Sequence, residues 1–165
     1  MIRFILSSIA VSLIFTGCTQ SESNLQLQSK IKSLEKDIED LKPGLGDIMS
    51  SIQTHHAKLY FAGKNENWDL AKFEYHEIEE GLEGAVRWHE TIEDVPEPTS
   101  QLIKITDTGM HELESAIEKK SKDQFLLAHR SLTNACNACH SAAAHSFIVI
   151  QEPKSLTFTN QKFEN

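Results

Sequence analysis

Cysteine, basic side chains and long apolar runs are all scarce in this chain. Its 165 residues include three cysteines and 16 lysines and arginines, against 24 aspartates and glutamates, for a formal net charge of -8. Nucleic acids and anionic bilayer surfaces repel an acidic protein, so we expect neither as a partner. The one strongly apolar run, residues 4–15, is shorter than a typical transmembrane helix.

Catalytic signatures and strand patterns are also missing. No pair of carboxylates and no nucleophile with a base stands at a recognisable catalytic spacing, and no glycine-rich phosphate loop is present. Residues 44–152 contain almost nothing with the alternation of a strand. We therefore expect an all-α domain, and we do not expect an enzyme.

What the chain does contain is the pentapeptide Cys136-Asn-Ala-Cys139-His140. C-x-x-C-H places two thiols one helical turn apart, so both can form thioether bonds to the two vinyl groups of one haem, and the next residue offers an imidazole to the iron. The motif predicts one haem c, held covalently by Cys136 and Cys139, with His140 as the proximal iron ligand.

Two other readings of the motif fit the sequence less well. A redox C-x-x-C would stand at a helix N-terminus after a strand, where the helix dipole lowers a thiol pKa, but this motif lies deep inside an Ala- and Leu-rich helical stretch. A zinc site needs further Cys or His at ligand spacing, and only His145 is near.

The third cysteine, Cys18, is explained by the N-terminus. Arg3 and the apolar run after it have the form of a secretory signal over residues 1–17. The residues up to the cysteine, Phe15-Thr16-Gly17-Cys18, resemble the bacterial lipobox, although Phe15 replaces the usual Leu. The resemblance implies a lipid on Cys18 and a tether to the periplasmic side of a bacterial membrane. Thr19 stands where an Asp would signal inner-membrane retention, which favours the outer membrane.

Residues 18–43 form the expected tether. Its apolar residues recur at spacings of four, three, four and three, the a/d pattern of a coiled-coil seam: Leu27, Ile31, Leu34, Ile38 and Leu41. The helix either associates with a second copy or lifts the domain off the membrane, or else it lies along the domain or is partly frayed. Pro43 and Gly44 end it.

Four amphipathic helical segments are expected in the domain, residues 44–152. Asn67 is a plausible N-cap, Pro96 and Pro98 break the chain, and Ser121-x-x-Gln124 has the form of a capping box. Short connections favour an antiparallel, up-down-up-down four-helix bundle. The polar tail, residues 153–165, is expected to stray over the surface or to stay disordered. The expected helices are Leu45 to Lys64, Trp68 to Glu93, Thr99 to Lys120, and Ser121 to Phe147.

A C-terminal helix bearing C-x-x-C-H in an exported four-helix bundle resembles the class II c-type cytochromes, that is, cytochrome c-prime and its low-spin relatives. The resemblance covers residues 45–150, and it implies covalent haem on Cys136 and Cys139 and iron ligation by His140. The class often has a basic residue four positions after the histidine, where this chain has Ala144. The resemblance therefore does not imply that a basic side chain acts on the proximal side of the haem in this chain.

The sixth iron ligand decides between functions. Leu45, Met49, Ile52, His56 and Leu59 share the expected inward stripe of the first helix. An antiparallel register brings His140 closer to Met49 than to His56, so we rank Met49 first as distal ligand, ahead of an open distal face and of His56. Met49 could instead be a gap-filling core thioether, and His56 a buried, hydrogen-bonded imidazole.

The main functional hypothesis is a monohaem electron carrier with an unknown redox partner protein. The alternatives are a five-coordinate haem protein that binds nitric oxide or carbon monoxide as a sensor or scavenger, and a structural helical lipoprotein. A homodimer is compatible with all three.

Overall fold

The computed structural model describes residues 23–164, and within them the chain is helical, without strands. The prediction of an all-α protein is confirmed. The expected signal peptide and Cys18 lie outside the described residues. The chain divides into two compact units, Met1–Lys42 and Pro43–Asn165. No helix within residues 23–164 is long and apolar enough to cross a membrane.

The described part of the first unit is one helix, residues 23–41. Every residue in it is exposed, including the predicted apolar stripe.

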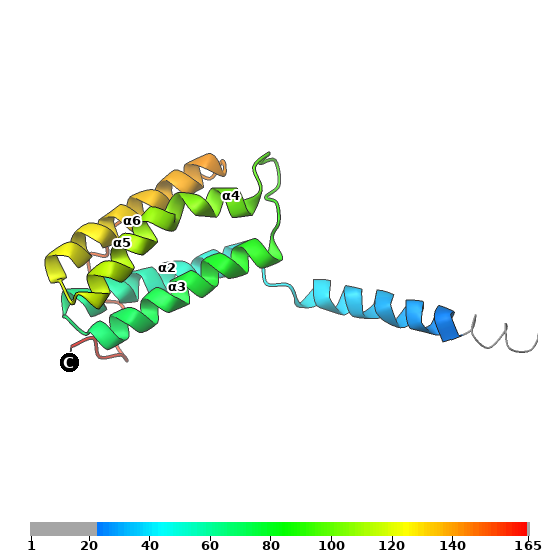
Figure 1. Cartoon of the computed structure of the whole chain (residues 1–165), viewed down its shortest axis with the longest axis horizontal. Coiled ribbons are helices and arrows are strands. Elements are labelled where there is room, and N and C mark those ends of the chain that lie inside the picture. The colour runs from blue at the N-terminus through cyan, green and yellow to red at the C-terminus, as the bar shows by residue number, and fades with distance from the viewer. Residues whose placement is uncertain (1–22, 165) are drawn as a thin grey trace, which may run out of the picture. The chain divides into compact units, whose positions relative to one another are not determined.

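The second unit begins with α2 (Leu45–Lys64), which is joined by a short turn to α3 (Trp68–Trp88). Both bounds of α2 agree with the sequence prediction. Asn67 caps α3 as predicted, because its side chain accepts a hydrogen bond from the Leu70 backbone N–H. The two helices lie side by side (Figure 1).

Helix α3 ends at Trp88, five residues before the predicted end at Glu93. The residues after Trp88 leave the helix and pack elsewhere. Ile92 and Val95 pack with Leu102 in a small apolar cluster. His89 Nε2 donates a hydrogen bond to the Pro43 carbonyl at 2.9 Å. Burial of these apolar side chains outweighs one more helical turn.

The predicted third helix is divided into α4 (Thr99–Ile103), the 3-10 turn η1 (Lys104–Thr106) and α5 (Asp107–Glu118). In the tight turn the Thr106 hydroxyl donates to the Ile103 carbonyl at 2.8 Å. A threonine that bonds its own backbone competes with the regular ladder, which explains the interruption.

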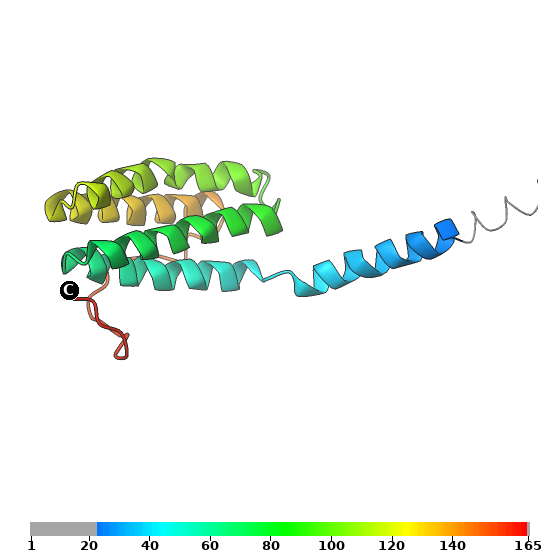
Figure 2. The same cartoon turned by 60° about the horizontal axis from the view of Figure 1, so that its bottom comes forward.

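Helix α6 (Lys122–Ala142) packs beside α5, as both views show (Figure 1, Figure 2). Two details of its prediction are wrong. Ser121 occupies the N-cap but its side chain makes no capping hydrogen bond, and the helix stops at Ala142, short of the predicted Phe147. Ala144, at φ 59°, adopts the left-handed conformation that ends the helix.

The C-terminal tail is tied to the domain at one buried point. Phe163 is fully buried, and its ring packs edge-on against Phe61 with ring centroids 6.1 Å apart. The prediction that residues 153–165 only stray over the surface is wrong at this residue, because one aromatic ring can bury enough apolar area to hold a polar tail.

Gly109 allows α5 to approach α6 closely. A Cβ atom there would lie 2.8 Å from the Cα of Leu132 and 3.0 Å from its backbone nitrogen, and a helix backbone cannot rotate out of the way. We expect Gly109→Ala to lower the free energy of unfolding by about 1–3 kcal/mol, as overpacking does. Denaturant unfolding followed by circular dichroism measures it.

Gly84 is the matched control. It lies inside α3, and a Cβ atom added there would meet nothing within 4 Å. Gly84→Ala should therefore stabilise the protein by about 0.5–1 kcal/mol, because alanine is the better helix former. Equal stability of the two variants would show that α5 and α6 are not in close contact at Gly109.

Candidate haem site

A cavity of about 490 Å³ is lined by residues of α2, α3, α4, η1 and α6 and of the segment after α6. Most of the lining is aliphatic, contributed by side chains such as Ile52, Leu82 and Leu102. Its size and apolar walls are typical of sites for small molecules and cofactors.

The motif residues Cys136, Cys139 and His140 all line this cavity from α6. Both cysteines are free thiols and half-buried. Burial, and then the neighbouring Cys139, raise the pKa of the Cys136 thiol to about 11, and burial also raises the pKa of Cys139. A redox-active thiol pair needs a lowered pKa, so the site is unlike a thioredoxin-type centre.

The His140 ring is held by the segment that follows α6. Its Nδ1 donates to the Ile148 carbonyl at 3.1 Å. A ring with Nδ1 occupied in this way presents Nε2 as its free lone pair, the arrangement that orients histidine ligands of metals.

Asn137, inside the motif, fixes that segment in place. Its side-chain amide donates to the Ile150 carbonyl at 2.9 Å and accepts from the Ile150 N–H at 2.7 Å. The two bonds hold the chain two residues beyond Ile148 against α6. The sequence analysis did not identify Asn137, Ile148 or Ile150 as part of the site. Among these three, only Asn137 could have been noticed, because a polar amide lies between the two cysteines of the motif.

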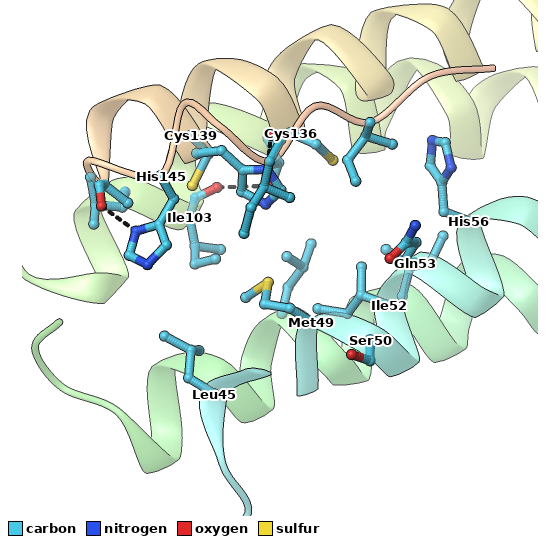
Figure 3. A pocket seen from close by; sticks show the side chains of 18 of the residues that line it. Leu45, Met49, Ser50, Ile52, Gln53, His56, Ile103, Cys136, Cys139 and His145 are labelled. Carbon is cyan, nitrogen blue, oxygen red and sulfur yellow. Dashed lines mark hydrogen bonds between the residues drawn. The ribbon is translucent and has the colours of Figure 1, made fainter. Parts of the chain in front are cut away.

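The opposite wall of the cavity belongs to α2. Figure 3 shows the Met49 side chain reaching from α2 into the space below α6, while His56 lies at the other end of the cavity. Both predicted candidates for the distal ligand therefore line the same cavity as the motif, at different levels along α2.

Two contacts give the register between α2 and α6. A Cβ atom at Gly63 would lie 2.2 Å from the Phe125 ring, and His56 Nε2 lies 2.9 Å from Thr133 Oγ1. Residue numbers rise along α2 as they fall along α6, so the helices are antiparallel. If this pairing of residues continues along both helices, His140 lies level with Met49. Met49 is two helical turns from His56.

His56 is already engaged in hydrogen bonds. The Thr133 hydroxyl donates to the His129 carbonyl at 2.8 Å, so it must accept from His56 Nε2, which therefore carries the proton. Burial, and then the charge of nearby His129, lower the pKa of His56 to about 3. His56 is a neutral ring whose Nε2 has no lone pair to offer.

Thr99 adds an unsatisfied polar group to the cavity wall. Its side chain is 1% exposed, and its hydroxyl has no hydrogen-bond partner within residues 23–164. Buried hydroxyls rarely stay unpaired, so this group indicates a missing acceptor or donor. A carboxylate at the edge of a cofactor would satisfy it.

The described residues contain no group of three or more His, Cys, Asp or Glu side chains arranged to hold a bare metal ion. No family model matches the chain, and comparisons with curated proteins and with solved structures found no significant match. The motif and the cavity around it are therefore the features that indicate a function.

Proposed function

We propose that this chain is a monohaem c-type cytochrome that carries single electrons. The observation that supports this best is the cavity of about 490 Å³ on which Cys136, Cys139 and His140 converge. The donor set fits one haem c: two thiols for the thioether bonds, one imidazole and apolar walls. Bound haem would supply an iron that gains and loses one electron.

The arrangement of the helices is part of this proposal. α2 packs on α3, α5 packs on α6, and α2 runs antiparallel to α6. These contacts support an up-down-up-down four-helix bundle of the class II cytochrome kind, with α4, η1 and α5 together as the third helix. In that bundle the cavity lies between helices, and Ile52, Leu82 and Leu102 contribute to its apolar lining.

The chain's own residues would fix the cofactor and its surroundings. Cys136 and Cys139 would hold it on α6, and the Ile148 carbonyl would keep the His140 ring turned. Thr99 would donate to a carboxylate of the cofactor, and Met49 would offer its thioether from the other side. Rigid placement of this kind suits electron transfer.

The charge of the domain supports a redox partner with a basic face. Residues 68–118, which include α3 and α5, contain 14 acidic and three basic side chains. Such a one-sided field steers a cationic partner toward that side.

The functional test is a redox titration of the protein produced with a haem-maturation system. We expect a sharp low-spin α band in the reduced state and a single transition that follows a one-electron Nernst curve. A broad high-spin spectrum that shifts with carbon monoxide would support the gas-binding alternative instead.

For location, we propose a lipid anchor on Cys18 and a place on the periplasmic side of a bacterial membrane. Acyl chains bind the bilayer, so the mature protein should fractionate with membranes. Cys18→Ser should release it or leave it unprocessed. Equal incorporation of labelled palmitate by the variant and the unmodified chain would refute the anchor.

A further inference from the structure

Helix 23–41 has an apolar stripe that no other described residue of its own unit covers. The stripe consists of Leu27, Ile31, Leu34, Ile38 and Leu41, which are between 47% and 81% exposed. A helix gains little from a continuous apolar stripe in water, and such stripes usually mark a contact with another helix.

The residue types in the stripe are sorted by position. Spacings of four, three, four and three place Leu27, Leu34 and Leu41 at d and both isoleucines at a. β-branched residues at a with leucine at d favour parallel, two-stranded coiled coils over trimers and tetramers. We propose that residues 23–42 form a parallel two-stranded coiled coil with a second copy of this chain.

The flanking charges also match a second copy. In this heptad Lys30 and Asp37 stand at g, and Glu35 and Lys42 at e. A parallel dimer brings each g residue beside the next e residue of the other helix, so Lys30 meets Glu35 and Asp37 meets Lys42. Both charged flanking pairs then join opposite charges.

An antiparallel pair fits less well. Full overlap of the two stripes would centre both helices on Leu34, and Glu35 would lie beside Glu35 of the partner subunit. The core does not separate the two orientations, because isoleucine faces isoleucine and leucine faces leucine in both. The repulsion between the two Glu35 carboxylates therefore favours the parallel orientation.

The coil spans fewer than three heptads, and isolated helices of this length are marginal in water. A shared membrane anchor would raise the local concentration of the second copy. A parallel orientation places both N-termini on the same side, as two anchors in one bilayer require. The test therefore uses the full chain in the membranes of the cells that make it.

Oxidative cross-linking on a non-reducing gel tests both the pairing and its direction. Ile31→Cys puts a thiol at an a position, which faces itself only in the parallel dimer, so we expect a disulfide-linked dimer. Lys36→Cys, on the outward f position of the same helix, is the matched control and should stay monomeric, as should the unmodified chain. Equal cross-linking of both variants, or of neither, would overturn the proposal.

A charge swap in the Ile31→Cys background tests the specificity. Glu35→Lys with Asp37→Lys makes all four charged e and g positions basic, and Lys30→Glu with Lys42→Glu makes all four acidic. Each chain alone should lose the cross-linked dimer, whereas co-expression of the two should restore it. Dimers formed equally by each chain alone would overturn the pairing.

These outcomes are independent of the proposed electron transfer. The haem spectrum should be the same in all of these variants, because the substitutions lie outside the second unit. Cross-linking without bound haem would support the coiled coil and refute the cytochrome proposal. Bound haem without cross-linking would support the cytochrome proposal and refute the coiled coil.

Discussion

Replacing both motif cysteines, Cys136→Ala with Cys139→Ala, is expected to abolish covalent haem completely. Each thioether bond needs its own thiol, and the described chain has no other cysteine. Haem staining of a denaturing gel should show a band for the unmodified chain and none for the double variant. Each single variant should keep a weaker band, because one bond is enough to survive denaturation.

The control for this result is Asn134→Ala. Asn134 is an exposed residue of α6, two positions before the motif, and it contributes no atom to the chemistry. Its haem stain should equal that of the unmodified chain. Persistent haem in the double cysteine variant would contradict the assignment of the motif.

Met49→Leu is expected to change a low-spin spectrum to a high-spin one and to open the protein to carbon monoxide. The substitution keeps the side-chain volume and removes only the thioether, so packing should be nearly unchanged. Outer-sphere electron transfer is favoured when the iron keeps the same ligands in both oxidation states, and Met49 lies at the level of His140. Absorption spectra with and without carbon monoxide measure the effect.

Ile52→Ala and His56→Ala separate ligation from packing. Ile52→Ala enlarges the same cavity without removing sulfur, and it should lower stability but keep the low-spin spectrum. His56→Ala removes the donor to Thr133 and should cost about 1–3 kcal/mol of stability, also without a spectral change. Loss of the low-spin spectrum only in His56→Ala would identify histidine ligation and refute the role of Met49.

The sequence predicted the helix starts better than the helix ends. Pro43-Gly44 and Asn67 mark the starts of α2 and α3, because a break and a side-chain cap are local signals. The chain beyond α2, α5 and α6 turns through Glu66, Lys120 and Ala144 in the left-handed conformation, at φ values of 59°, 52° and 59°. Glycine usually marks such a turn, and none of these three residues is glycine. The end of α2 could still be predicted from the polar residues 65–67, whereas the end of α6 could not.

The early end of α3 and the burial of Phe163 depend on tertiary packing. Ile92 and Val95 leave the helical path because Leu102 and Ala143 offer them an apolar contact. Phe163 binds the core from a tail of polar composition. No local pattern distinguishes these residues from exposed ones.

The candidate site was predictable where the signal is a short motif or a helical period. Cys136, Cys139 and His140 follow from their spacing alone, and the period of α2 places Met49 on the wall of the same cavity. The ligand role of Met49 stays a prediction. Ile148 and Ile150 could not be found from the sequence, since their contacts use backbone atoms that any residue provides.

The most direct test of the central claim is the intact mass of the purified chain after denaturation. If Cys136 and Cys139 hold haem c, the polypeptide should be heavier by the mass of one haem, and the added mass should survive acid and organic solvent. A polypeptide with only its own mass, made beside a functioning haem-maturation system, would contradict the proposal that this chain is a c-type cytochrome.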